Sequence, residues 1–405
     1  MEAATSTKNP ARWRMLALIM GVYAAFGMTA GSIPPLVGTI IDDLEMTSGQ
    51  MGLVLGAWQL IFIGTASPLG TLVDRIGERK AIAIGLSVVL ASLVLRGLAV
   101  NFPTLLLAVA IFGMGGPIIS VGVPKVVALW FEGRERGTAA GSYIIGRDIG
   151  TAIALGTAAS FVLSLTGSWR GISLVYGGFV FLVLVAWLLF ARDAPAERRG
   201  LVASATDAGA PSVPALGQRG LLKLRNVQVV LLLGFTTFLL SHGLQNWLPT
   251  LLEESGMTIE QAGRWVALSM LPAMVGHIVL PTLARYGYRG MALFVLLALS
   301  AVTTAGLAFL TGPALIVVLL IGTMVRLPTL QIITLVLMET KGVGAARIGG
   351  AAGLFFTVAE VGGFSGPLML GIIRDATGSL EAGVLALAIA TGVLMSSTLL
   401  IREPR

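Results

Sequence analysis

Six ionisable residues lie inside long apolar stretches of this sequence, where a charged side chain is costly and is therefore a candidate for function. They are Arg96, Lys125, Arg147, Asp148, Arg326 and Glu360. An arginine guanidinium can bind a carboxylate through two parallel hydrogen bonds, which suits it to recognising an anion. We therefore expect Arg147 and Arg326 to bind an anionic ligand. Asp148 and Glu360 would then neutralise the empty site or take up protons.

A structural explanation of the same charges competes with this one, because Arg147–Asp148 and Arg326–Glu360 could instead be local pairs that hold helices together. Neighbouring residues of a helix point about 100° apart, so Arg147 and Asp148 are expected to need other partners or water. Lys125 is either a gate charge or a second substrate contact. Near a helix end, an arginine such as Arg96 can extend its charge to the membrane surface.

Uncharged polar residues at similar depth extend the candidate site. Both histidines of the chain, His242 and His277, lie in apolar stretches, where each could carry a proton or stay neutral and bond a backbone carbonyl. Other polar side chains could contact a substrate or only bond a neighbouring helix. The predicted substrate-binding set is Arg147, Arg326, Lys125, His242, Asn246, Gln59, Tyr143 and Gln331.

The elements that position these residues must cross a membrane. The chain of 405 residues is 56% hydrophobic and 12% charged, whereas soluble domains carry about 25% charged residues. Apolar runs of about 20 residues recur, and each can span a bilayer as a helix that satisfies its own backbone. We predict an all-α membrane protein with twelve helices over residues 13–38, 49–73, 79–100, 103–130, 137–165, 168–191, 226–251, 264–284, 289–310, 313–337, 347–370 and 380–401.

The composition also excludes several kinds of chemistry. The chain has no cysteine, so disulfides, thiol catalysis and cysteine–zinc sites are excluded. With only two histidines in apolar stretches, a metal site is not expected, nor is a cofactor. The sequence contains no phosphate-binding loop and no nucleophile–histidine–acid arrangement. An enzyme or a membrane receptor is therefore the least favoured class.

The basic residues predict the orientation in the membrane. Of 27 lysines and arginines, 20 fall in the tails and in alternate loops, six of them between residues 192 and 225, while the opposite loops hold only Arg170, Arg264 and Arg374. Because cytoplasmic loops carry the excess of positive charge, we expect a multi-pass protein of the bacterial inner membrane with both termini in the cytoplasm. The net charge of +7 is then a consequence of topology, and nucleic-acid binding is not expected.

The two halves of the sequence repeat each other. Residues 45–52 resemble 256–263, and 137–141 resemble 349–353, with offsets of 211 and 212. We predict an N-terminal six-helix bundle over 1–191, a cytoplasmic linker over 192–225 and a C-terminal six-helix bundle over 226–405. The offset of 212 pairs Asp148 with Glu360. Duplicated halves of this kind place a binding site between them, near the middle of the membrane.

One loop between the second and third predicted helices carries a family signature. Its residues Gly70, Asp74, Arg75, Gly77 and Arg79 resemble the G-x-x-x-D-R-x-G-x-R/K-R/K loop of the major facilitator superfamily. A carboxylate such as Asp74 can accept hydrogen bonds from a helix N-terminus and pair with a basic side chain. The motif is therefore expected to act as a gate that closes the cytoplasmic side.

Other fragments agree with this resemblance, which spans the chain. They are Trp130-Phe131, Trp247-Leu248-Pro249, Asp375-Ala376-Thr377-Gly378-Ser379 and a decayed second loop over 283–289. Arg96, Pro124-Lys125 and the segment 246–249 further resemble cyanate/nitroimidazole-type permeases of that superfamily, which are associated with small anions or small polar organic compounds.

The resemblance implies a secondary active transporter working by rocker-switch alternating access, and we expect it to be a monomer. With the buried arginines, it predicts a small anionic solute, either monocarboxylate-like or an inorganic oxyanion, moved with a proton or by exchange. The alternative is a drug/proton antiporter that exports small organic compounds. Such antiporters usually carry a glycine-rich stretch ending in Gly-Pro in helix five, where this chain has Gly146-Arg147-Asp148-Ile149-Gly150.

Overall fold

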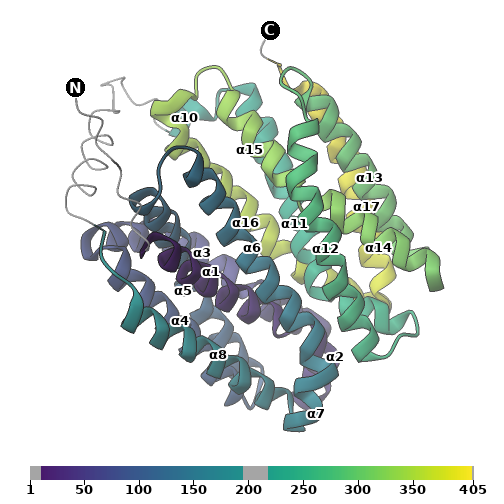
Figure 1. Ribbon diagram of the computed structural model, residues 1–405. Helices are drawn as coiled ribbons and strands as arrows, with labels where there is room; N and C mark the ends of the chain where they lie inside the picture. The colour runs from purple at the N-terminus through teal and green to yellow at the C-terminus, as the bar shows by residue number, and fades with distance from the viewer. Residues whose placement is uncertain (1–10, 195–217, 404–405) are drawn as a thin grey trace, which may run out of the picture.

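The computed structural model describes residues 11–194 and 218–403, and over these ranges the chain is helical without strands. Twelve helical stretches are long and apolar enough to cross a membrane, so the predicted all-α, twelve-helix class is confirmed. Figure 1 shows the helices of residues 11–194, from purple to teal, and those of 218–403, from green to yellow, as two neighbouring groups. We refer to these groups as the N-half and the C-half.

The first six spans form the N-half. They are α1 (Ala11–Gly31) continued by η1 (Pro34–Leu36) and α2 (Val37–Asp43); α3 (Ser48–Ile76); α4 (Glu78–Gly97); α5 (Phe102–Trp130); α6 (Gly133–Thr157) continued by the π-helical turn η2 (Ala158–Val162) and α7 (Leu163–Thr166); and α8 (Trp169–Phe190). All six match predicted spans to within about five residues.

The C-half begins with the short α10 (Gln218–Leu221) and then forms six spans. They are α11 (Arg225–Glu254), α12 (Ile259–Leu283), α13 (Arg289–Phe309), α14 (Gly312–Arg326) with α15 (Thr329–Glu339), α16 (Gly344–Thr377), and α17 (Leu380–Leu394) with η3 (Met395–Leu400). The tenth predicted helix is interrupted at Leu327-Pro328. Proline has no backbone N–H to continue the hydrogen-bond ladder there.

Three predicted boundaries were wrong by five residues or more. The first span ends at Asp43 rather than 38, because α2 continues it beyond η1. The eighth span begins at Ile259 rather than 264, because Thr258 and Gln261 form a capping box that starts the helix earlier. The eleventh extends to Thr377 rather than 370, and it ends where Gly378 adopts a left-handed conformation with φ +76°. The additional turns of α16 carry Arg374 and Asp375, which the sequence had placed in a loop.

The two halves are packed together at one end of the bundle. We call this the far end; it holds α2 and α7, at the bottom of Figure 1, and the opposite end, where α1 and α11 begin, is the linker end. At the far end a Cβ added to Gly52 of α3 would lie 2.5 Å from the Pro367 carbonyl oxygen of α16. One added to Gly263 of α12 would lie 2.6 Å from the Leu155 oxygen of α6. Helices of opposite halves therefore touch through their backbones.

The linker end is more open. A Cβ added to Gly137 or Gly141 of α6, or to Gly349 or Gly353 of α16, would meet no atom of residues 11–194 and 218–403 within 4 Å. These are the same positions that the sequence repeat pairs between the halves. The glycines that open α6 and α16 therefore have free space beside them at this end.

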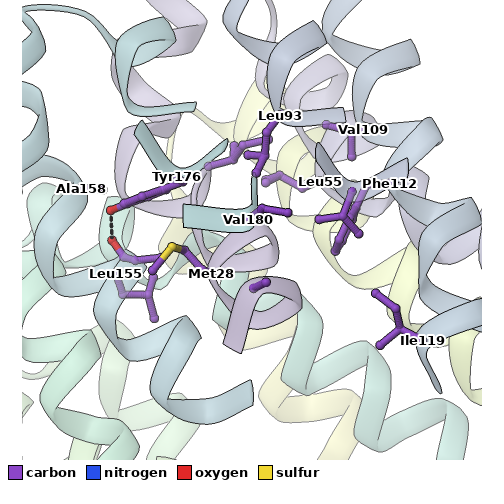
Figure 2. Packing of buried hydrophobic residues seen from close by; sticks show 14 of the residues in the cluster. Met28, Leu55, Leu93, Val109, Phe112, Ile119, Leu155, Ala158, Tyr176 and Val180 are labelled. Carbon is purple, nitrogen blue, oxygen red and sulfur yellow. Dashed lines mark hydrogen bonds between the residues drawn. The ribbon is translucent and has the colours of Figure 1, made fainter. Parts of the chain in front are cut away.

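The N-half has its own apolar core. Figure 2 shows Met28, Leu55, Phe112, Leu155 and Tyr176 among its packed side chains. The hydroxyl group of Tyr176 donates a hydrogen bond of 3.2 Å to the Ala154 carbonyl oxygen, so its polar group is satisfied inside the core. This core fixes α6, and with it the backbone that carries Arg147.

Close packing of α1 against α6 leads to a stability prediction. A Cβ on Gly150 would collide with the Ala24 carbonyl oxygen of α1, whereas one on Gly141 of the same helix would meet nothing within 4 Å. Gly150→Ala is therefore expected to destabilise the fold by about 1–3 kcal/mol through overpacking. Gly141→Ala should leave stability unchanged or raise it by up to about 1 kcal/mol. Thermal unfolding of both purified variants would test this, and equal melting temperatures would contradict it.

Candidate functional site

Arg147 of α6 lies at the seam between the two halves. Its side chain is 49% exposed, and its charge acts electrostatically on Tyr23 of the N-half and on His242 and Glu360 of the C-half. Because the Asp148 carboxylate to which it donates also lies 3.9 Å from His277 of α12, the guanidinium lies beside the C-half. The site is therefore shared by both halves.

Asp148 pairs with its neighbour Arg147, as the structural alternative has it, although we expected the two residues to need other partners. The Arg147 Nε and Nη2 atoms donate to Asp148 Oδ1 at 3.3 and 3.2 Å. The long arginine side chain can fold back over the 100° between the two positions. Asp148 Oδ2 also lies 3.9 Å from Nε2 of His277 on α12, and Gln331 of α15 interacts with the same histidine. Asp148 thus connects α6 with the C-half.

A second polar group contains Gln59 of α3, His242 of α11, and Glu360 and Gly363 of α16. Gln59 Nε2 lies 3.2 Å from His242 Nδ1, which joins the two halves. A Cβ on Gly363 would lie 3.1 Å from Glu360 Oε2, 3.2 Å from His242 Cδ2 and 3.4 Å from Gln59 Cγ. The three side chains therefore converge on one glycine, and we call this group the Gly363 cluster.

Arg326 is the last residue of α14, just before the interruption at Pro328. Arg326 is only 4% exposed. It forms no ion pair with any residue within 11–194 and 218–403. The electrostatic influence on Glu360 comes from Arg147 instead. The alternative of a local Arg326–Glu360 pair is therefore wrong, and Arg326 is a buried cation whose Nε makes no hydrogen bond to any described residue.

Lys125 lies away from these groups. Its Nζ atom is 2.9 Å from Asp74 Oδ1, in an exposed ion pair between α5 and the end of α3. Of the two roles considered for Lys125, this contact favours that of a gate charge.

Arg96 also differs from expectation, because it is 2% exposed rather than extended to the surface. It donates to the Thr29 carbonyl oxygen at 2.9 Å and to Ser32 Oγ at 3.1 Å, and these acceptors hold it inside.

The remaining residues of the signature loop lie at the linker end of the N-half. Gly77 takes φ +83° between α3 and α4, a conformation that favours glycine. The Arg79 guanidinium lies 3.7 Å from Asp193 and donates to the Leu188 carbonyl oxygen at 3.3 Å. Gly70, in the last turns of α3, would place a Cβ 3.8 Å from Val121, and Arg75 is exposed.

Two more predicted residues are placed as follows. The Asn246 side chain is mostly buried and donates to the His242 carbonyl oxygen of its own helix at 2.8 Å. The Tyr143 ring packs edge-on against Tyr23 of α1, with 4.8 Å between ring centroids. Since Tyr23 is influenced by Arg147, Tyr143 belongs to the surroundings of the arginine.

Sequence reasoning missed a contact between the halves at the far end. The Asp375 carboxylate of α16 accepts hydrogen bonds from the backbone N–H groups of Ser48 and Gly49, both at 2.8 Å, at the first turn of α3. Arg374 lies 2.9 Å from Glu254 of α11 and donates to Ser48 Oγ at 3.1 Å. We call these five residues the far-end latch. Asp375 belongs to the fragment 375–379 that resembles the family, but no local pattern predicts that its side chain reaches α3.

These observations define a class of protein: a polytopic membrane protein whose buried polar residues gather where two helical halves meet, as in secondary transporters. Residues 19–367 match the Major Facilitator Superfamily. The chain therefore belongs to the major facilitator superfamily and is a multi-pass inner-membrane transporter.

Relatives and solved structures agree with this assignment. The chain is 28% identical to the 2-nitroimidazole transporter of Escherichia coli (strain K12) over 395 residues, covering 96% of this chain and 95% of the relative. It is 32% identical to the 3-(3-hydroxy-phenyl)propionate transporter of the same organism over 407 residues, covering 94% and 90%. A bacterial homolog of the human lysosomal transporter Spinster, solved in an inward-facing and occupied conformation, has the same fold, with a TM-score of 0.80, 16% identity and 97% coverage of both chains.

Proposed function

We propose that this protein is a secondary active transporter of a small organic anion of the monocarboxylate class. The observation that carries the proposal is the half-exposed Arg147 guanidinium, which faces polar residues of the opposite half. A carboxylate bound there would receive charge-assisted hydrogen bonds, which are about twice as strong as neutral ones. Relatives named for hydroxyphenylpropionate, hexuronate and tartrate support an organic acid over an inorganic oxyanion.

Alternating access follows from the two ends of the bundle. The far end is closed by backbone contacts and by the far-end latch, while glycines at the linker end have free space beside them. With both termini and the linker over 192–225 in the cytoplasm, as the excess of basic residues supports, this arrangement is open to the inside. Asp74 would close the linker end in the opposite state. A reporter fused to the C-terminus that is active only in the cytoplasm tests the orientation; an inactive fusion would reverse it.

We assign charge balance to Asp148 and proton coupling to Glu360. Asp148 neutralises Arg147 through a direct ion pair, so an incoming carboxylate would compete with it. Glu360 is buried and is influenced by the charge of Arg147. It would take up a proton on one side of the membrane and release it on the other as the protein alternates between its two states. Arg326 remains our candidate for a second contact with the solute, because a buried cation without an ion pair has unused donors.

A drug/proton antiporter is the alternative function. This alternative is supported by a 27% identity to the quinolone resistance protein NorA of Staphylococcus aureus. The match extends over only 115 residues and covers 28% of this chain. The helix-five stretch from Gly146 to Gly150 opposes it, because a pair of charges stands where drug antiporters keep glycines and a proline.

A ligand screen by thermal stabilisation of the purified protein tests the proposal, because a ligand that binds only the folded state raises its melting temperature. At least one small carboxylate is expected to stabilise the protein by several degrees and to be taken up by proteoliposomes that contain it. Adding a pH gradient to the uptake assay separates proton coupling from exchange. Stabilisation by neutral or cationic drugs, with no response to any carboxylate, would favour the drug antiporter.

A further inference from the structure

The Gly363 cluster contains buried hydrogen-bonding capacity that the protein leaves unused. Gln59 is fully buried and Glu360 is 7% exposed. Gln59 uses its Nε2 atom on His242, while Gln59 Oε1 and Glu360 Oε2 are buried without a hydrogen-bond partner among the described residues. Gln59 Oε1 is an acceptor, whereas Glu360 Oε2 accepts when the carboxyl group is charged and can donate when it carries a proton. A buried acceptor that lacks a donor costs free energy, and a ligand that brings a donor recovers it.

The cluster lies within reach of the anion site. A Cβ on Gly27 of α1 would contact the Arg147 carbonyl oxygen. The ring of the neighbouring Phe26 lies 6.1 Å from Trp58, which in turn lies 5.8 Å from His242 of the cluster, measured between ring centroids. A solute whose carboxylate is held by Arg147 would therefore extend another part of its structure toward Gln59 and Glu360. That part must donate a hydrogen bond, since Gln59 Oε1 accepts one.

Aromatic rings surround the cluster. The His242 ring lies 5.8 Å from Trp58 and 5.2 Å from Phe238, measured between ring centroids. Phe238 in turn contacts Phe356 of α16, which is 40% exposed. Offset and edge-on contacts of this kind favour a flat ring as the body of a ligand. These rings come from both halves of the molecule, as do the polar groups between them.

We propose that the Gly363 cluster recognises a hydroxyl group of the solute, and that the solute is a hydroxylated aromatic monocarboxylate. Its carboxylate binds Arg147 and its ring packs against the aromatic residues. Its hydroxyl donates to Gln59 Oε1 and accepts from the Glu360 carboxyl group when that group carries a proton. This inference rests on the proposed function, because it places the carboxylate on the same arginine. Gln59 and Glu360 are then the residues that decide which aromatic acid is accepted.

The test compares two acids that differ by one hydroxyl group: phenylpropionate and its meta-hydroxyl derivative. Binding of both to the purified full-length protein is measured by isothermal titration calorimetry. The wild type is expected to bind the hydroxylated acid about tenfold more tightly or better, because an unpaired buried acceptor penalises the other acid. In Gln59→Leu this ratio should fall to about one, while the affinity for phenylpropionate changes by less than about threefold. Gln228→Leu, which removes an exposed amide from α11, is the matched control and should keep the wild-type ratio.

The outcomes separate this inference from the proposed function. Equal binding of both acids by the wild type, or a ratio that survives in Gln59→Leu, would overturn the hydroxyl recognition and leave the anion transporter intact. Tighter binding of a sugar acid than of either aromatic acid would overturn the aromatic part of the proposal. A protein that binds neither acid nor any other carboxylate would refute the proposed function itself. Should Gln59→Leu fail to fold, Gln59→Met decides in its place, since methionine keeps the length of the side chain, lacks the carbonyl acceptor and is expected to lower the same ratio.

Discussion

Replacing Arg147 with glutamine is expected to lower the affinity for the transported anion by more than about a hundredfold and to abolish uptake. The bound carboxylate would lose charge-assisted hydrogen bonds worth about 1.5–3 kcal/mol and the attraction of the positive charge. The Arg147 side chain is half exposed and faces the opposite half, so its removal deletes few packing contacts. Binding of the stabilising carboxylate to purified variants, together with uptake by proteoliposomes, measures the effect.

Three variants make this experiment decisive. Arg264→Gln removes an exposed arginine that donates to the Glu260 carbonyl oxygen of its own helix and should transport normally. Arg147→Gln combined with Asp148→Asn avoids leaving the mostly buried Asp148 carboxylate without its arginine, so a loss of binding in the double variant cannot come from an unpaired charge. Arg326→Gln tests the second buried arginine. Normal transport by both Arg147→Gln and Arg326→Gln would exclude the assigned anion site.

The sequence predicted the twelve spans well because each is a long apolar run, and lipid forces such a run to be a helix. Errors arose where polar groups extend or break a helix. The capping box at Thr258 and the interruption at Pro328 are local signals that an apolar window averages away. Both could have been found from the sequence by reading caps and prolines before setting the boundaries.

The candidate site was predicted only in part, because its contacts join residues that are distant in the chain. The repeat offset placed Asp148 and Glu360 at equivalent positions, yet their surroundings differ. Asp148 meets Arg147 and His277, whereas Glu360 lies beside Gln59 and His242. Helical spacing gives the direction of a side chain but not its rotamer, so the sequence could not decide between the Arg147–Asp148 pair and other partners for the two residues. The buried environment of Arg96 depends on acceptors in another helix, which no local pattern shows.

Asp375→Asn is expected to weaken the far-end latch and to shift the protein toward a state in which this end opens. The carboxylate accepts two backbone hydrogen bonds at the N-terminus of α3, where a negative charge is stabilised by the helix dipole. Asparagine keeps one acceptor oxygen but loses the charge. Because Asp375 is exposed to solvent, we expect a change of about 1–2 kcal/mol, which corresponds to a factor of roughly 5–30 in the ratio of the two states.

The chain has no native cysteine, so spin labels can be attached to introduced cysteines without altering other residues. Val100→Cys and Thr311→Cys place labels in exposed far-end loops of opposite halves. Distances between them by double electron–electron resonance should show a larger long-distance population in Asp375→Asn. Asp42→Asn, an exposed carboxylate at the same end, should leave the distribution unchanged.

Replacing Asp74 is expected to shift the same distance distribution in the opposite direction. Here it pairs with Lys125 inside the N-half, and as a gate it would contact the C-half only when the linker end closes. Asp74→Asn is therefore expected to reduce the long-distance population at the far end. The state that is open at the far end would lose the contact that stabilises it. The state that is closed there would lose only an exposed ion pair, worth at most about 1 kcal/mol. Shifts of the same sign in Asp74→Asn and Asp375→Asn would contradict a rocker-switch in which one gate holds each end, since a ligand or mutation can move the equilibrium only through a difference between the two states.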